Sequence, residues 1–198
     1  MQNKLKKTVL TLAVGSAMAL STGCALSPQL INLQTESPLK VTADSLGRTA
    51  LVRVRDLRDD TASLGNRGGS DPEQALLLSK PNLKDALTAK MQGTLQQLGF
   101  GGASPLDPVK VDLAVEEFHY QCNEGSWVNQ CDLTIHFNLT VINDGNTFAQ
   151  PFTIKQQRSV ATAPRAGYNE EWVNGALDKL WSHMMTQPQV TQALGVRN

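Results

Sequence analysis

Two cysteines, Cys122 and Cys131, lie nine positions apart in a stretch where apolar and polar residues alternate. Such a pair can form a disulfide or, with two further ligands, bind zinc. His119 and His136 are close by in the sequence, but strand alternation places both on the face opposite the cysteines. The spacing therefore favours a Cys122–Cys131 disulfide, with two free buried thiols as the alternative, and predicts no metal and no other cofactor.

The candidate acid–base groups are Asp56, Glu116, Glu117 and the three histidines of the chain. Glu116 and Glu117 point to opposite faces of an extended strand, which does not suit a carboxylate pair that works on one substrate. His183 stands among apolar residues of a predicted helix, where a structural role is typical. The sequence therefore predicts no catalytic residue and favours a protein that is not an enzyme. A hydrolase is the alternative, and it requires two of these groups to converge in one cleft.

A third cysteine, Cys24, follows a segment typical of a bacterial secretory signal. Small residues precede it, and this order resembles the lipobox of bacterial lipoproteins, in which the thiol receives diacylglycerol and the new N-terminus is acylated. Ser21 stands where that motif usually has Leu. We expect residues 1–23 to be removed and Cys24 to be lipidated, an ordinary signal followed by a structural thiol being the alternative. The signal-like segment consists of Lys4, Lys6 and Lys7 followed by the apolar run Thr8–Leu20.

Lipidation at Cys24 predicts a membrane anchor without a transmembrane helix, because two or more acyl chains hold a protein firmly. An Asp directly after the cysteine would resemble a signal for retention at the inner membrane, but this chain has Ala25 there. We therefore expect the protein to be anchored to the outer membrane, with its domain facing the periplasm. Removal of the three early lysines leaves 15 basic and 18 acidic residues, a mildly acidic domain with no electrostatic attraction to anionic lipid. Residues 24–38 contain two prolines and no helical periodicity, and we expect them to form a flexible tether that lets the domain stand off the bilayer.

We expect residues 39–198 to form a single domain. Hydrophobic residues make up 40% of the chain and charged residues 18%, with a formal net charge of zero. This balance excludes extensive disorder and removes the basic footprint of a nucleic-acid-binding protein.

Periodicity predicts an α+β domain. Val52 and Val54 alternate with Arg53 and Arg55 in a first strand over residues 49–57, which is followed by a long loop over 58–71. Two helices with one apolar face each are expected over residues 81–98 and 170–185. The predicted order is β-α-β-β-β-α, a two-layer sandwich with a mostly antiparallel sheet and two long helices on one face.

Residues 109–160 predict two successive hairpins. A β-bulge at Glu116–Glu117 gives the first strand a single apolar face and sets Cys122 opposite Cys131. Asp144-Gly145 suits a type I′ turn between the second and third strands. Pro151 cannot donate to a sheet ladder, so we expect the third strand at an edge. The predicted opposed pairs are Tyr120 with Leu133, Phe118 with Ile135, Val115 with Phe137, Leu113 with Leu139, Val111 with Val141, Val141 with Phe148, Phe137 with Phe152, and Ile135 with Ile154.

The chain as a whole resembles the YajG-like family of bacterial outer-membrane lipoproteins. The resemblance rests on the lipobox, on Asp56-Leu57-Arg58 after the first strand, on Leu98-Gly99-Phe100 at the end of the first helix, and on the hairpin that follows. It implies outer-membrane attachment and a compact periplasmic α/β domain. It implies no catalytic residue.

These observations favour a lipid-anchored module that binds or scaffolds another envelope component, either a protein or cell-wall material, and not nucleic acid. We expect contacts from the 58–71 loop, from the loop that holds Trp127, or from the sheet edge at Pro151. A carrier of a small apolar ligand is a further alternative, and it predicts an internal cavity lined by Leu87, Met91, Phe118 and Leu180. The individual contact residues that we expect are Arg58, Asn66, Arg67 and Trp127.

Overall fold

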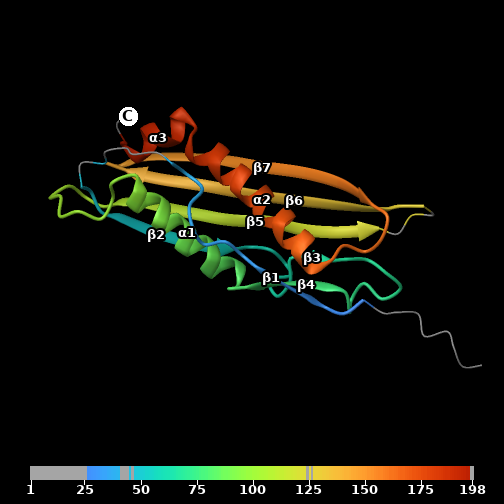
Figure 1. Ribbon diagram of the computed structural model, residues 1–198. Helices are drawn as coiled ribbons and strands as arrows, with labels where there is room; N and C mark the ends of the chain where they lie inside the picture. The colour runs from blue at the N-terminus through green and yellow to red at the C-terminus, as the bar shows by residue number, and fades with distance from the viewer. Residues whose placement is uncertain (1–25, 41–44, 46, 124, 126, 197–198) are drawn as a thin grey trace, which may run out of the picture.

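The structure is a computed structural model, and it describes residues 26–40, 45, 47–123, 125 and 127–196. This part of the chain forms one mixed sheet of seven strands together with three helices (Figure 1). In chain order the elements are β1 (Gln29–Asn32), β2 (Ala50–Asp56), β3 (Gly65–Asn66), β4 (Leu76–Lys80), α1 (Leu83–Gln97), β5 (Val109–Asn123), β6 (Asn129–Asn143), β7 (Asn146–Val160), α2 (Ala166–Met185) and α3 (Pro188–Leu194).

The sheet runs β1-β4-β3-β5-β6-β7, and β2 pairs with the first half of β5 while β3 pairs with its second half. The pairs β1–β4, β2–β5 and β3–β5 are parallel, whereas β3–β4, β5–β6 and β6–β7 are antiparallel. The long antiparallel strands β5, β6 and β7 therefore form the main body of the sheet, and short strands complete one side of it.

Both predicted hairpins are confirmed with their registers. The β5–β6 register shifts between Val115 and Glu117, so that Cys122 lies opposite Cys131. At the β6–β7 turn, Asp144 and Gly145 have φ angles of 50° and 78°, the left-handed conformation that a type I′ turn requires. Every opposed apolar pair predicted for the two hairpins is present.

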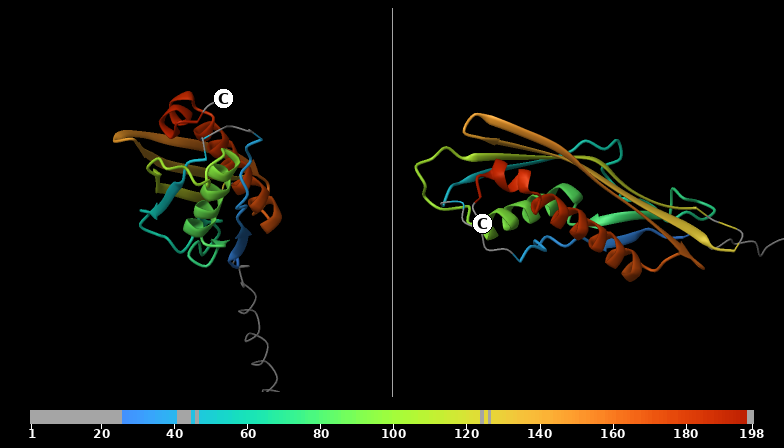
Figure 2. Two further views of the ribbon diagram at one scale, coloured as in Figure 1. Left: turned by 90° about the vertical axis from the view of Figure 1, so that its left-hand side faces the viewer. Right: turned by 90° about the horizontal axis from the view of Figure 1, so that it is seen from above.

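All three helices lie on the same side of the long strands, with α2 running obliquely across them and α1 beside β2 (Figures 1 and 2). The apolar stripes of α1 and α2 are buried, which confirms both predicted helix faces. Gly99, with a φ of 84°, follows the C-cap of α1, a position whose left-handed conformation suits glycine. The stripe residues are Leu83, Leu87, Met91, Leu95 and Leu98 of the first helix, and Val173, Ala176, Leu177, Leu180, Trp181 and Met184 of α2.

Several parts of the prediction are corrected. The helix α2 begins four residues earlier than predicted, so Asn169 lies within it, where it is buried and accepts a hydrogen bond of 2.8 Å from the Tyr120 hydroxyl. The short strands β3 and β4 and the helix α3 were not predicted, so the element order differs from the expected one. Runs of two to five residues carry too little periodicity to be recognised as strands.

The expected flexible tether over residues 24–38 is also corrected. Residues 29–32 form β1, and Ile31 and Leu33 are buried in the core. The backbone N–H of Asn32 donates to the Glu170 carboxylate at 2.9 Å, so a side chain of α2 covers the outer edge of β1. Burial of its apolar side chains, which offsets the loss of chain entropy, fixes this segment to the domain.

No helix in the described part of the chain is long and apolar enough to cross a membrane.

Candidate functional site

A groove of about 760 Å³ lies between strand β2 and the beginning of helix α1. One wall is the strand itself and the segment that leaves it, and the other wall is the first two turns of the helix. The lining residues are Val52, Arg53, Val54, Arg55, Asp56, Leu57, Thr61, Asn82, Leu83, Lys84 and Thr88.

The edge of β2 that faces this groove has no strand partner among the described residues. On its other edge, the N–H of Leu57 donates to Val115 at 2.9 Å, and the carbonyl of Thr49 accepts from Val109 at 3.0 Å. In a parallel ladder the residues that bond the partner alternate with residues whose N–H and C=O point away from it. The backbone N–H and C=O groups of Val52 and Val54 therefore point away from β5, sideways from the edge of the sheet and toward the groove.

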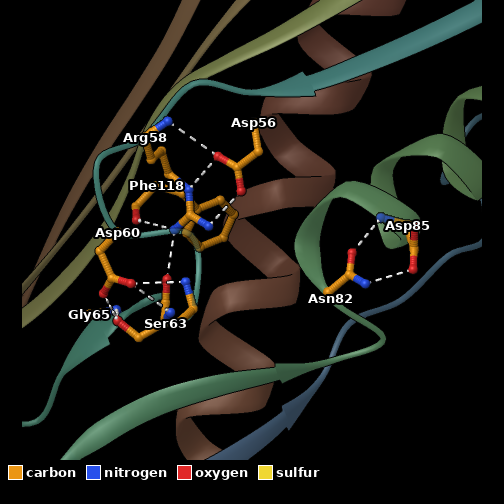
Figure 3. Close-up of polar contacts among 9 residues, drawn as sticks. Asp56, Arg58, Asp60, Ser63, Gly65, Asn82, Asp85 and Phe118 are labelled. Carbon is orange, nitrogen blue, oxygen red and sulfur yellow. Dashed lines mark hydrogen bonds and ion pairs between the residues drawn. The ribbon is translucent and has the colours of Figure 1, made fainter.

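The helical wall is positioned by a strong helix start. Asn82 is the N-cap of α1: its side-chain oxygen accepts from the N–H of Asp85 at 2.9 Å, and its amide donates to the Asp85 carboxylate at 2.6 Å (Figure 3). The first bond satisfies a backbone donor that a helix N-terminus otherwise leaves free, and the second holds the Asn82 side chain in place. The apolar side chain of Leu83 is buried beneath this turn, whereas Lys84 stays exposed on the wall of the groove.

The end of the groove is closed by a buried ion pair between Asp56 and Arg58 (Figure 3). Two parallel bonds of 2.8 Å join the Arg58 guanidinium to the Asp56 carboxylate. The Arg58 side chain is 6% exposed and the Asp56 side chain 10%. The same guanidinium donates to the carbonyls of Ser63 at 2.7 Å and Phe118 at 3.3 Å. The Asp-x-Arg triplet thus joins the end of β2 to the following loop and to β5.

The loop after this pair is held by a turn at Asp60. Its carboxylate accepts from the Ser63 hydroxyl and from the backbone N–H groups of Ala62 at 2.9 Å and Ser63 at 3.2 Å (Figure 3). The hydrogen bond from Ser63 lowers the pKa of Asp60 below its ordinary value, because it stabilises the ionised carboxylate. This loop leads directly into β3, so the turn also fixes where β3 meets β5.

Basic side chains line the outer wall of the groove. Arg53 is 73% exposed on its side chain, and Arg55 forms bonds of 2.7 and 2.9 Å with Asp112 of the neighbouring strand. The hydrogen bonds that Arg55 donates to the Asp112 carboxylate raise the pKa of Arg55. Since one carboxylate faces two guanidinium groups here, and Lys84 stands on the opposite wall, the walls of the groove are positively charged.

The four residues expected to contact a partner differ in how far their side chains are exposed. The Arg58 side chain is buried in its ion pair. Arg67 is 6% exposed and donates to the carbonyls of Ser27 and Pro164. The Asn66 side chain lies half-buried in β3 and accepts from the N–H of Gly68 at 3.0 Å, whereas Trp127 is 92% exposed.

The buried positions of the two arginines have one physical reason. An irregular segment leaves carbonyl groups without partners, and a guanidinium offers five donors that can satisfy them. Their side chains therefore do not form the exposed contact surface that the sequence suggested, and residues 58–71 are in part strand rather than loop alone.

Cys122 and Cys131 are joined in a disulfide, as predicted. Cys24, expected to be lipidated, lies outside the described residues, as does the signal-like segment before it.

The candidate acid–base groups do not gather in the groove. Asp56 is paired with Arg58, while Glu116 lies 3.5 Å from His136 and does not line the groove. His119 and His183 are exposed at other places. The residues expected to line an apolar cavity are buried in the common core, and none of them lines this groove; they are Leu87, Met91, Phe118 and Leu180.

The groove was not found from the sequence. Alternation over residues 49–57 identifies the strand and its two faces, but not its neighbours in the sheet. One sequence pattern could have helped to locate it: Asn82 and Asp85, which follow Pro81, form a capping pattern that predicts the start of the helix on one wall of the groove.

Comparison with known proteins agrees with the sequence-based resemblance. A family model described as uncharacterized lipoprotein, Lipoprotein_16, matches residues 38–195. The chain belongs to this family, the YajG family of lipoproteins. Membership is consistent with attachment to a membrane through lipid. No curated protein matches the chain.

Three solved structures are similar to this member of the YajG family over most of their length. An uncharacterized protein is 17% identical with a TM-score of 0.44, and the alignment covers 80% of this chain and 94% of that one. A putative neuraminyllactose-binding hemagglutinin homolog from Helicobacter pylori is 9% identical with a TM-score of 0.42, covering 83% and 96%. PelC from Paraburkholderia phytofirmans, described as a dodecamer, is 12% identical with a TM-score of 0.34, covering 82% and 95%.

Proposed function

We propose that this YajG-family protein is a non-enzymatic binding module of the bacterial cell envelope. In this proposal Cys24 carries the lipid that holds the protein at the outer membrane, and the α+β domain faces the periplasm. Family membership supports the anchor, as do the signal-like residues that precede the cysteine. The domain would then act as a fixed attachment point for another envelope protein.

The observation that carries the binding function is the free edge of β2 beside the groove. Backbone groups of Val52 and Val54 point into a groove of about 760 Å³, and a strand edge in this state readily accepts an extended segment. The occupant would add a strand to the sheet along the free edge of β2, beside the start of α1. Its main chain would supply the hydrogen bonds, and the walls would select its side chains.

The charge of the walls favours an acidic segment. Side chains of an added strand alternate between its two faces, so one set would stand beside Arg53 and Arg55 and the other beside α1. Acidic residues on the first face would meet guanidinium groups that Asp112 now partly neutralises. Lys84 supplies positive charge on the helical wall.

The other free strand edge is less suited to this role. Strand β7 pairs with β6 alone among the described strands, as expected of an edge. Pro151 lies opposite Asn138 at a position whose backbone points away from β6, so the edge lacks an outward donor at its centre. A proline at this place hinders strand addition, which favours β2 as the contact edge.

Photo-crosslinking in living cells tests the proposal. A photoreactive amino acid at Lys84 or Thr61, on the two walls, should give one discrete adduct with an envelope protein. The same group at Leu106, an exposed residue outside the groove, should not. Absence of an adduct from both groove positions would contradict the proposal.

A proline substitution tests the strand-addition mode itself. Val52→Pro removes an N–H that points away from β5, so the sheet should lose no ladder bond and the fold should be retained. The adduct from Lys84 should disappear. Val52→Ala, the matched control, shortens the same side chain but keeps the N–H, and it should keep the adduct. An undiminished adduct in a folded Val52→Pro variant would show that the partner does not pair with β2.

A further inference from the structure

The start of β1 and the C-terminal end of β5 lie at the same end of the molecule (Figures 1 and 2). The strand registers establish this independently of any view. Gln29 lies opposite Leu77, Leu77 opposite Gly65, and Gly65 opposite Tyr120, so these four residues form one row across the sheet. Because β1 is parallel to β4, β4 antiparallel to β3 and β3 parallel to β5, β1 runs antiparallel to β5. The chain before Gln29 therefore approaches the end of the sheet that β5 reaches after Tyr120.

The chain just before β1 is held against the domain. Arg67 donates to the carbonyl of Ser27, and the Gln29 side chain donates to the carbonyl of Pro164 at 3.1 Å. Cys24 is three residues before Ser27, a length of chain that spans at most about 10 Å when fully extended. A lipid on Cys24 would therefore hold this end of the domain close to the bilayer.

The same end carries an exposed aromatic residue. Trp127 is 92% exposed and Val128 is 48% exposed. Both residues lie within the segment that the Cys122–Cys131 disulfide closes. Trp172 and Trp181 are 1% and 0% exposed, so Trp127 differs from the other two tryptophans of the chain.

We propose that this end of the domain faces the membrane and that Trp127 enters the headgroup region of the bilayer. From β1 to β5 there are three strand spacings, about 15 Å, so the anchor and Trp127 can reach one bilayer surface together. An indole combines an apolar ring with an N–H donor, and tryptophan is enriched at membrane interfaces for that reason. The lipid would supply the affinity, and Trp127 would add a second contact that sets the orientation.

This inference rests on the proposed lipid anchor and replaces the expectation that the domain stands off on a flexible tether. That expectation assumed free chain through residue 38, whereas β1 leaves a short connection. The domain needs no attraction to anionic lipid for this contact, because the apolar ring and the N–H donor of the indole themselves favour the headgroup region. Headgroups of zwitterionic phospholipid would serve.

Fluorescence quenching tests the inference on the mature lipidated protein, reconstituted in phosphatidylethanolamine/phosphatidylcholine vesicles. Phospholipid brominated near the headgroup end of its chains should quench the tryptophan emission that Trp127 contributes. Acrylamide, a quencher dissolved in the aqueous phase, should quench this emission much less when the protein is on vesicles than when no vesicles are present. The Trp127→Ser variant defines this contribution, since Trp172 and Trp181 remain buried. The variant should stay attached through its lipid but show no quenching by brominated lipid.

Two outcomes separate this inference from the proposed anchor. If wild-type protein purified from membranes carries no lipid on Cys24, the proposed anchoring fails, and the orientation fails with it. If the lipidated protein is attached to the vesicles while Trp127 remains fully quenchable by acrylamide and unaffected by brominated lipid, the anchor stands and the orientation is refuted. Cys24→Ser, added to the same vesicles, should show no quenching by brominated lipid, because one tryptophan alone does not hold the domain at the surface.

Discussion

Removing the Arg58 guanidinium should strongly destabilise the fold. The substitution Arg58→Ala leaves the Asp56 carboxylate, 10% exposed on its side chain, without its two 2.8 Å bonds. It also removes the donor to the Ser63 carbonyl. Breaking a buried ion pair by removing one partner costs about 3–5 kcal/mol, and the residual exposure of this pair favours the lower value, about 3 kcal/mol. For a domain of this size that loss corresponds to a decrease in Tm of roughly 6–12 °C.

Urea denaturation followed by circular dichroism measures this loss. Arg53→Ala is the matched control, because Arg53 lies on β2, five residues before Arg58, with 73% of its side chain exposed and an ion pair at 3.6 Å. This substitution should cost less than about 1 kcal/mol. Arg58→Lys keeps the charge but not the paired donors, so it should fall between the two. A free energy of unfolding within about 1 kcal/mol of wild type for Arg58→Ala would refute a structural role for the triplet.

Three further predictions concern the disulfide, the Asp60 turn and the approach of β3 to β5. Reducing the disulfide of the β5–β6 hairpin should lower the free energy of unfolding by about 2–3 kcal/mol, which urea titrations with and without dithiothreitol will measure. Ser63→Ala should raise the pKa of Asp60 toward 3.8, as followed by NMR titration. Because the folded pKa is lowered, the stability that this carboxylate contributes is present above the ordinary pKa and is lost as the pH falls through the lowered one. Gly65→Ala should cost at least about 2 kcal/mol in thermal unfolding, since Gly65 has a φ of 123° and an added Cβ would overlap the backbone of β5. Gly93→Ala, in the middle of α1 with open space around it, should instead raise the stability by about 0.5–1 kcal/mol.

Much of the main sheet was predictable because long strands carry their register in the sequence. Alternation over β5 and β6 fixes which side chains are buried, and the parity change at Glu116–Glu117 requires a bulge. Asp144-Gly145 then fixes the β6–β7 register through the geometry of its turn. These constraints act between neighbouring segments of the chain, so no knowledge of distant contacts is needed.

The short strands could not be predicted for the opposite reason. Strands β1 and β4 pair with one another across more than forty residues of chain, and β3 contributes two residues. Such segments become strands because an existing edge accepts their backbone groups, and neither their length nor their pattern demands it. The same is true of Arg58 and Arg67, whose exposure depends on which carbonyls the folded loops leave without partners.

The sequence by itself determined the long hairpins with their disulfide, the apolar faces of the two main helices, and the signal-like segment that ends at Cys24, because each of these is encoded by residues near one another in the chain. Only the tertiary structure decided that one edge of β2, beside α1, has no strand partner in the described part of the chain. It also decided that the chain before β1 approaches the end of the sheet where Trp127 lies. Both depend on the order of strands across the sheet, which is set by packing between segments far apart in the sequence.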